Sequence, residues 1–364
     1  MDYFAHGGDL DGYARRFPGR VPLDFSASLN PFGIPAPVRA ALHEAVETCA
    51  RYPDPFCRGL GEALATEWGV SPAQIFFGNG AAEVFDRLAA VLRPRNALLL
   101  APGFSEYERA LGQVGCDCRF HTLREAEQFA VTERLLTELT GEIEAVFLCS
   151  PNNPTGQVIE PSLLDRIAAR CMEINAWLVI DECFGGFLAD DRTRSMRRWL
   201  ERYDRVVVVR AFTKLYALAG VRLGWCMTQQ PALTEALRAA GQPWNVSYPA
   251  QQAGAAALEC VDFVRETARF IAQERVFFAE ELRRCGLWVC PGQANFILFR
   301  SENPRLAERL LPRGILLRDC SSFRGLGPGW YRAAVHRHEE NLQLLENIWE
   351  VLHGENNYGA GHVL

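Results

Sequence analysis

The stretch "RAFTKLYALAGVRLGW", residues 210–225, decides how the rest of the chain is interpreted, because its Lys214 comes five positions after the last of four consecutive valines, residues 206–209. A run of four β-branched residues predicts a buried strand. Lys214 is therefore expected in the turn at the carboxyl end of that strand, where open α/β sheets hold ligands. A solvated surface lysine is the ordinary alternative, and neighbouring segments must decide between the two.

Composition limits the possible functions. The chain has 364 residues, of which 49% are hydrophobic, enough for a large core divided between a major and a minor domain. A net charge of −6 gives no basic field, so nucleic acid and anionic membranes are poor candidate partners. The N-terminal residues lack the apolar core of a signal peptide, and no apolar run approaches the ~20 residues of a membrane span. We expect a cytoplasmic protein.

Twelve cysteines are scattered along the chain without any C-x-x-C pair. The closest two, Cys116 and Cys118, have no histidine cluster nearby. Cysteines in a reducing compartment are usually small buried hydrophobes. We therefore expect neither disulfides nor a metal site.

Short apolar runs alternate with helical patterns. The runs at residues 96–101, 144–150, 176–182 and 205–212 have the length and composition of buried parallel strands. Residues 81–93, 106–114 and 161–174 show the apolar spacing of helices. This alternation predicts an α/β fold in which helices cover both faces of a mostly parallel sheet.

The pattern changes near residue 249. A long helical stretch to residue 285 precedes strand-like runs at 295–300 and 314–319 and a final helix. We expect an N-terminal arm (1–40), a large domain (41–248), a smaller α+β domain (249–354) and a flexible tail (355–364).

Three further segments place polar groups at the same edge of the predicted sheet. "FFGNGAAEVF", residues 76–85, predicts a strand, a turn and a helix start whose free N–H groups at Gly80, Ala81 and Ala82 can receive a phosphate. "SPNNPTG", residues 150–156, presents Asn153 after a strand. "VIDECFGGF" ends a strand with Asp181, a carboxylate that needs a cationic or hydrogen-bonding partner when buried.

Together with residues 210–225, these segments resemble the fold type I pyridoxal-phosphate (PLP) enzymes over nearly the whole chain. "TKLYALAGVRLGW", residues 213–225, fills that family's cofactor-lysine motif. The resemblance implies that Lys214 joins the cofactor covalently and later carries a proton at the substrate's Cα. It also implies that Asp181 pairs with the pyridine nitrogen and that Asn153 binds the ring hydroxyl.

The same resemblance assigns the rest of the cofactor site. Thr213, Arg222 and the turn at Gly80, Ala81 and Ala82 match the phosphate cradle. Phe104 matches the aromatic residue that stacks on the ring, with a core aromatic as the alternative. Tyr52 matches a tyrosine that, in these homodimers, reaches the cofactor phosphate of the neighbouring subunit.

Two families within this fold compete: histidinol-phosphate aminotransferase and L-threonine O-3-phosphate decarboxylase. The segment at His6, Gly7 and Gly8 resembles a His-Gly-Gly element of the decarboxylases that approaches a substrate phosphate. "LDFSASLNPFGIP", residues 23–35, also resembles the decarboxylases, although Ser28 stands where asparagine is usual. Phe184 replaces a tyrosine that many aminotransferases direct at the cofactor's ring oxygen.

Arginines in the C-terminal third complete the expected substrate site. Arg318 and Arg332 match family positions that bind the substrate carboxylate and phosphate, for which a planar guanidinium is suited. Relatives often have another arginine where this chain has His336, which leaves a second basic contact open.

The sequence thus predicts a homodimeric PLP enzyme that decarboxylates L-threonine O-3-phosphate for the cobalamin nucleotide loop, with L-serine O-phosphate as a close variant substrate. An aminotransferase acting on histidinol phosphate or another amino acid is the alternative. A non-catalytic PLP-binding module of a transcription regulator is a third possibility, but no residues remain for a DNA-binding domain.

Overall fold

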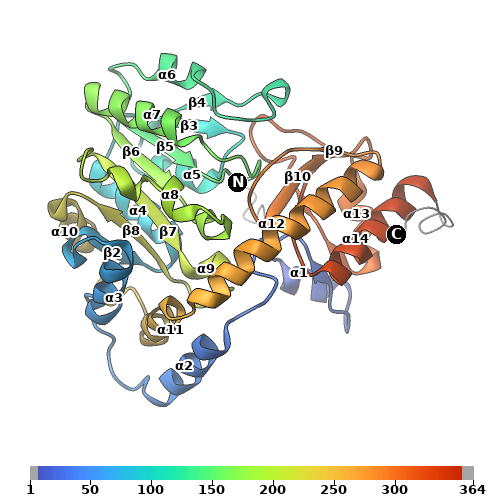
Figure 1. Ribbon diagram of the computed structural model, residues 1–364, viewed down its shortest axis with the longest axis horizontal. Helices are drawn as coiled ribbons and strands as arrows, with labels where there is room; N and C mark the ends of the chain where they lie inside the picture. The colour runs from blue at the N-terminus through green and yellow to red at the C-terminus, as the bar shows by residue number, and fades with distance from the viewer. Residues whose placement is uncertain (1–6, 355–364) are drawn as a thin grey trace.

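The computed structural model describes residues 7–354 and is built around one seven-stranded sheet (Figure 1). The strand order is β2-β8-β7-β6-β5-β3-β4, and β8 alone runs antiparallel to its neighbours. The four runs predicted as buried strands are β3, β5, β6 and β7, so the expected mostly parallel sheet is confirmed. The bounds are β2 (Ile75–Gly78), β3 (Asn96–Ala101), β4 (Asp117–Thr122), β5 (Ala145–Cys149), β6 (Trp177–Asp181), β7 (Val206–Ala211) and β8 (Gly224–Thr228).

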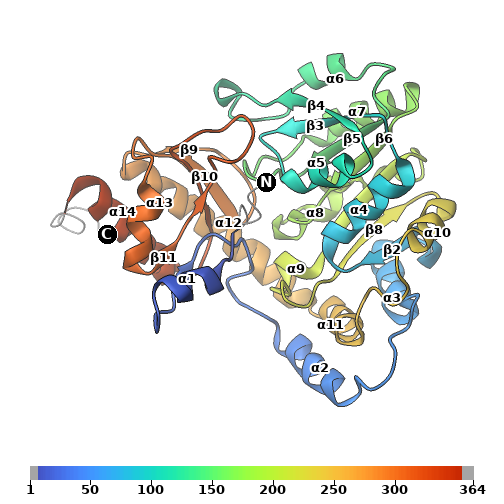
Figure 2. The same ribbon diagram turned by 180° about the vertical axis from the view of Figure 1, so that it is seen from behind.

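Helices cover both faces of this sheet, because successive strand residues point to opposite faces and both sets are apolar. Along β7, Val206 and Val208 pack in one core cluster and Val207 and Val209 in another. Figures 1 and 2 show the two faces, with α7 in front in one view and α4 and α5 in front in the other. The first cluster includes α3 (Arg58–Trp68), α7 (Pro161–Glu173) and α11 (Tyr248–Leu258); the second includes α4 (Gly80–Leu92), α5 (Ser105–Gly112) and α10 (Pro231–Ala239).

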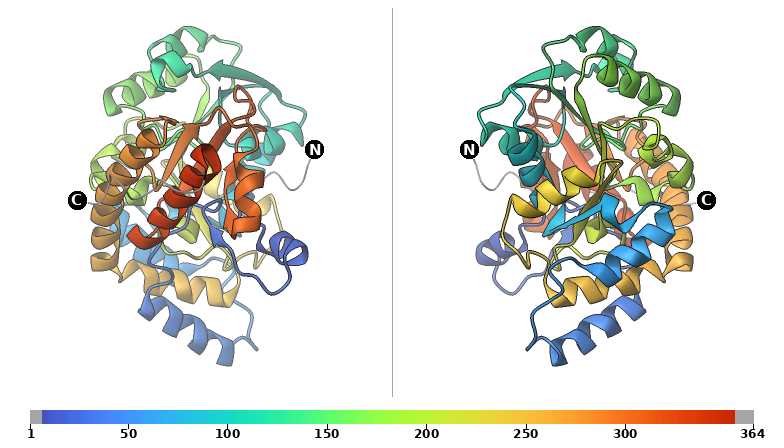
Figure 3. Two further views of the ribbon diagram at one scale, coloured as in Figure 1. Left: turned by 90° about the vertical axis from the view of Figure 1, so that its right-hand side faces the viewer. Right: turned by 90° about the vertical axis from the view of Figure 1, so that its left-hand side faces the viewer.

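A smaller antiparallel sheet, with strand order β12-β13-β10-β9, has its own apolar core. Figure 3 shows α14 lying in front of this sheet, and three apolar residues of that helix, Leu344, Leu345 and Ile348, are fully buried in its core. Its elements are β9 (Trp288–Val289), β10 (Phe296–Arg300), β12 (Arg318–Asp319), β13 (Trp330–Ala334), α12 (Val261–Arg284), α13 (Leu306–Leu310) and α14 (His338–His353). The predicted combination of a large α/β part and a smaller α+β part is confirmed.

The segment predicted as an arm is partly structured and attached to the small sheet's side of the molecule. It contains α1 (Leu10–Arg16), β1 (Leu23–Asp24) and the start of α2 (Ala36–Glu47). β1 pairs in parallel with β11 (Ile315–Leu316), so residues near the start of the chain are hydrogen-bonded to residues about 290 positions later. The remaining short helices are α6 (Arg134–Glu138), α8 (Asp191–Arg194) and α9 (Phe212–Leu215).

The long helical stretch expected at 249–285 is two helices, α11 and α12, separated at Glu259 and Cys260. α11 packs against α2 and α3 beside the large sheet, and the domain boundaries given above stay a prediction. The expected tail, residues 355–364, lies outside the described residues. All twelve cysteines are free thiols, and eight of them are buried. Within residues 7–354, no helix combines the length and hydropathy needed to span a membrane.

Candidate active site

A cavity of about 610 Å³ lies at the carboxyl-terminal edge of the large sheet and reaches to the small sheet. Most of the predicted site residues lie on its wall. Because β8 is antiparallel, its amino end meets the carboxyl ends of the other strands, which brings Arg222 to the same edge as Asp181 and Lys214. The predicted residues lining the cavity are Gly7, Ser28, Ala81, Ala82, Phe104, Asn153, Asp181, Thr213, Lys214, Arg222, Arg318 and Arg332.

Lys214 lies in the short helix α9 that directly follows β7. Burial and the nearby positive charge of Arg332 lower the pKa of its amine to about 8. Its Nζ lies 5.7 Å from the centre of the Phe184 ring, which also lines the cavity. Lys214 is moreover the only lysine of the whole chain, so every other strongly basic side chain is an arginine. The cavity thus contains the one ε-amine of the protein, with its neutral, nucleophilic form accessible near physiological pH.

Asp181 ends β6 and is almost fully buried. Its Oδ1 accepts a hydrogen bond from the Cys183 N–H (2.9 Å), and its Oδ2 accepts one from the Tyr107 hydroxyl (2.5 Å). Burial raises the pKa of the Asp181 carboxyl, while these two donors favour its charged form. Tyr107 was not identified from the sequence, because only the packing of α5 over β6 brings its hydroxyl to Asp181.

The start of α4 and Arg222 form a second feature of the site. Gly80 has φ +77°, and a Cβ placed there would lie 2.3 Å from Arg222 Nη2, so only glycine lets the guanidinium approach the helix start. A Cβ at Gly224 would likewise lie 2.3 Å from the Ala81 nitrogen. Free N–H groups at a helix start together with a guanidinium make an anion-binding corner. Gly80 itself does not line the cavity; Ala81 and Ala82 do.

Arg318 and Arg332 lie side by side on adjacent strands, β12 and β13. Arg332 is 7% exposed, and its Nη atoms donate only to neutral acceptors: Asn153 Oδ1 (2.5 Å) and Ser26 O (3.0 Å). Its Nε has no hydrogen-bond partner among the described residues. Burial lowers the pKa of Arg332 to about 10 and lowers that of Arg318 as well.

Neither of these guanidiniums forms an ion pair with a carboxylate of residues 7–354. Buried charges are normally paired. Two uncompensated arginines in one cavity therefore favour a ligand that carries more than one negative charge.

The N-terminal segment closes part of the cavity. The Gly8 N–H donates to Ser26 Oγ (2.8 Å), and a Cβ at Gly7 would lie 2.1 Å from Ser26 O. This carbonyl is the one that accepts from Arg332. Ser28 lines the cavity, is 1% exposed, and its hydroxyl has no partner among the described residues. His6, the remaining residue of this predicted element, lies outside the described residues.

Two residues that the sequence analysis considered, Tyr52 and His336, lie outside the cavity. Tyr52 is 81% exposed, packs on Trp244 with ring centres 5.2 Å apart, and does not line the cavity of its own chain. His336 also stays outside the cavity: its Nε2 bonds to Asp24 O (3.0 Å), and its Nδ1 faces Glu340 (3.4 Å). His336 therefore supplies no second basic group to the cavity wall.

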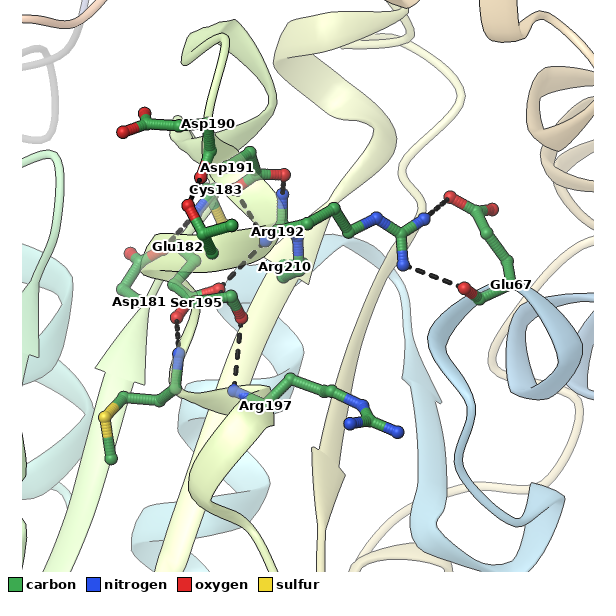
Figure 4. A network of polar contacts seen from close by, with 12 residues as sticks. Glu67, Asp181, Glu182, Cys183, Asp190, Asp191, Arg192, Ser195, Arg197 and Arg210 are labelled. Carbon is green, nitrogen blue, oxygen red and sulfur yellow. Dashed lines mark hydrogen bonds and ion pairs between the residues drawn. The ribbon is translucent and has the colours of Figure 1, made fainter. Parts of the chain in front are cut away.

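A polar network supports the sheet edge behind Asp181. Figure 4 shows Arg210 between Asp191 and Glu182. Arg210 bonds to Asp191 at 2.6 Å and to Glu182 at 2.9 Å, and Glu182 also accepts from Ser195 Oγ (2.7 Å). Because Glu182 follows β6 and Arg210 belongs to β7, this network ties β6, which ends in Asp181, to β7, which leads into the helix that carries Lys214.

Comparison with known proteins identifies relatives over almost the entire chain. Residues 21–348 match the family described as aminotransferase class I and II. The threonine-phosphate decarboxylase of Salmonella typhimurium is 37% identical over 356 residues, which are 96% of this chain and 97% of that protein. The histidinol-phosphate aminotransferase of Nitratidesulfovibrio vulgaris is 32% identical over 355 residues, covering 96% and 94% of the two chains.

Solved structures agree on the fold. The crystal structure of the histidinol-phosphate aminotransferase from Clostridium acetobutylicum superposes with a TM-score of 0.84 at 28% identity. The superposition covers 90% of this chain and 98% of that one.

Enzymes of the matched family use PLP. The groups around the cavity fit this cofactor chemically. The ε-amine of Lys214 can react with an aldehyde, and the buried carboxylate of Asp181 can accept a hydrogen bond from a protonated pyridine nitrogen. The corner where Arg222 meets the start of α4 suits a phosphate. The chain belongs to the class I and II aminotransferase family, the fold type I enzymes that use PLP.

Proposed function

We propose that this protein decarboxylates L-threonine O-3-phosphate to an aminoalkyl phosphate for the cobalamin nucleotide loop, with L-serine O-phosphate as a possible second substrate. The observation that carries this proposal is the pair of arginines without carboxylate partners, Arg318 and Arg332, in the cavity that contains Lys214 and Asp181. A substrate with both a phosphate and a carboxylate would compensate their charges.

The relatives support this choice of reaction. The 37% identical protein from Salmonella typhimurium is named threonine-phosphate decarboxylase, whereas the relatives named histidinol-phosphate aminotransferase reach 32%. An adenosylcobalamin biosynthesis bifunctional protein of Leptospira interrogans is 28% identical over 97% of this chain and 42% of that protein. Phe184 adds to this support, because a phenylalanine cannot bond to a cofactor oxygen.

In this proposal each cavity residue has one task toward the cofactor. Lys214 would hold it covalently, Asp181 would accept a hydrogen bond from the pyridine nitrogen and so keep that nitrogen protonated, and Asn153 would contact the ring oxygen. Phe104 would stack on the ring, while Thr213, Arg222 and the start of α4 at Gly80, Ala81 and Ala82 would bind the phosphate. When bound, PLP withdraws electrons from the Cα of an attached amino acid.

The protein must then select which bond at Cα breaks. The bond that breaks is the one held perpendicular to the cofactor ring. A decarboxylase therefore needs to fix the phosphate so that the carboxylate, and not the hydrogen, takes that position. Gly7, Ser28 and Arg318 would hold the phosphate end, and Arg332 the carboxylate before it leaves. The ammonium form of Lys214 would return a proton to Cα.

The test is a single assay of the purified holoenzyme with L-threonine O-3-phosphate and no keto acid. We expect carbon dioxide and the amine phosphate in equal amounts over many turnovers, and no reaction with Lys214→Ala. If turnover required a keto acid and formed a new amino acid, the aminotransferase alternative would replace this proposal. L-Serine O-phosphate in parallel would measure selectivity for the substrate methyl group, which is worth about 1–3 kcal/mol.

A further inference from the structure

A third arginine, Arg324, reaches the same cavity from the segment between β12 and β13. Its Nη2 lies 2.9 Å from Glu108 Oε1, and its guanidinium lies over the Phe120 ring at 4.0 Å. Glu108 and Phe120 also line the cavity. Since Glu108 belongs to α5 on the large sheet, this ion pair joins the two parts of the molecule across the cavity mouth.

The backbone that carries Arg324 is held firmly. Phe323 and Leu326 pack against the main core cluster, and the Leu326 N–H donates to Phe323 O (3.0 Å). Gly325, at φ +84°, lies against Ala101 and Pro102 of the large sheet's edge. The side chain of Arg324 is less constrained than its backbone, because 56% of the side chain is exposed, as is 44% of the Glu108 side chain. The guanidinium can therefore change partners without movement of its backbone.

The charge balance of the cavity gives Arg324 a function. A phosphate monoester carries a charge close to −2 near pH 7, and an amino-acid carboxylate adds −1. Arg318 and Arg332 have no carboxylate partner in the described chain and supply only two positive charges. Arg222, which also lines the cavity, is assigned above to the cofactor phosphate, so Arg324 is the remaining arginine of the cavity wall that can supply a third charge, once Glu108 releases it.

We propose that Arg324 is a specificity-determining residue that binds the substrate phosphate, and that Glu108 neutralises it until the phosphate displaces the carboxylate. This inference rests on the proposed function only in taking the substrate to be phosphorylated. An exposed ion pair contributes little to stability, so breaking it costs little free energy. An arginine, by contrast, forms strong, bidentate hydrogen bonds with a phosphate dianion. The exchange is therefore favourable for a phosphate and unfavourable for a neutral or singly charged group.

The experiment measures inorganic phosphate binding to the holoenzyme by isothermal titration calorimetry, and KM and kcat for L-threonine O-3-phosphate. Three variants are compared with the parent: Arg324→Gln, Glu108→Gln and a matched control, Arg95→Gln. Arg95 pairs with Glu144 at 2.6 Å on the opposite edge of the sheet, before β3 and β5, and does not line the cavity.

Arg324→Gln should weaken phosphate binding and raise KM about tenfold, with kcat nearly unchanged. Glu108→Gln should act in the opposite direction and tighten phosphate binding, because it removes the competing carboxylate. Arg95→Gln should bind phosphate like the parent.

The proposal is overturned if Arg324→Gln binds phosphate normally. It is equally overturned if Glu108→Gln leaves phosphate binding unchanged or weakens it, since the pair would then be only a structural link between the two sheets. Calorimetry needs no turnover, so the proposal that the enzyme is a decarboxylase and the proposal that Arg324 binds phosphate can fail separately. If the enzyme released no carbon dioxide while phosphate binding still responded in opposite directions to the two variants, the decarboxylase assignment would be wrong and the role of Arg324 would stand.

Discussion

At the scale of single residues, the attachment of PLP to a lysine can be assigned without ambiguity, because Lys214 is the only lysine of the chain. Burial lowers the pKa of this amine to about 8, and the neutral form is the one that attacks an aldehyde. We therefore expect the rate at which cofactor-free protein attaches PLP to rise with pH and to reach half its maximum near pH 8.

Borohydride reduction followed by peptide mass analysis measures the attached fraction and should locate all of it on Lys214. An ordinary solvated lysine would instead reach half its maximal rate near pH 10.4. That result would show that the amine is not desolvated in the cavity.

A second prediction concerns the Tyr107 hydroxyl. Tyr107→Phe removes one of the two donors that favour the charged form of Asp181. The pKa of Asp181 should rise further, and kcat should fall about tenfold to hundredfold, the scale of a hydrogen bond to a charged group. Infrared spectroscopy of the cofactor-free protein should detect the protonated carboxyl at higher pH than in the parent.

Tyr203→Phe is a matched control for this change. It removes a comparable bond, from the Tyr203 hydroxyl to Asp165 Oδ1 at 2.7 Å, outside the cavity. Equal effects of the two substitutions would show that Tyr107 only stabilises the fold.

The difference between Asp181 and Tyr107 shows what the sequence could reveal at this scale. Asp181 ends an apolar run, so its position at the sheet edge follows from the pattern alone. Tyr107 lies in a helix whose rotation and height over β6 depend on ring packing with Phe85, Phe104 and Phe147. No local pattern encodes that arrangement. The uniqueness of Lys214, by contrast, could have been counted directly from the sequence.

At the scale of elements, long periodic segments were predictable and short ones were not. The strands β3, β5, β6 and β7 and the helices α4, α5 and α7 fall where their apolar patterns place them. The run at 314–319, expected as one strand, is divided into β11, which pairs with β1, and β12, which pairs with β13. Strands of two residues are too short to show an alternation of apolar and polar residues, and their pairing partners are distant in sequence.

The N-terminal segment gives a prediction at this scale. A Cβ at Gly7 would lie 2.1 Å from Ser26 O, a backbone atom that also accepts from Arg332. Gly7→Ala should therefore displace this segment and raise KM about tenfold, the scale of one hydrogen bond to a charged group, with little change in melting temperature. Gly59→Ala is the control, because a Cβ there meets no atom within 4 Å. Unchanged KM in Gly7→Ala would remove the segment from the substrate site.

At the scale of the whole molecule, residues from both sheets form the cavity, yet Tyr52 lies outside it. Tyr52, Phe56 and Trp244 are large hydrophobic side chains that are 81%, 52% and 46% exposed. The Tyr52 and Trp244 rings pack on each other, and exposed apolar side chains that lie together are typical of protein interfaces. We propose that a second copy of the chain covers them and that Tyr52 contacts the cofactor phosphate in the cavity of that copy, as the family resemblance implies.

Mixing two inactive variants tests this arrangement. In Lys214→Ala, both sites of a dimer lack the amine; in Tyr52→Ala, both lack the tyrosine. A mixed dimer contains one site with the intact Lys214 of one chain and the intact Tyr52 of the other. Random exchange makes half of the dimers mixed, each with one working site, so the mixture should recover about a quarter of the parent activity. If Tyr52 served its own chain, the intact lysine and tyrosine would never meet in one site and no activity would return.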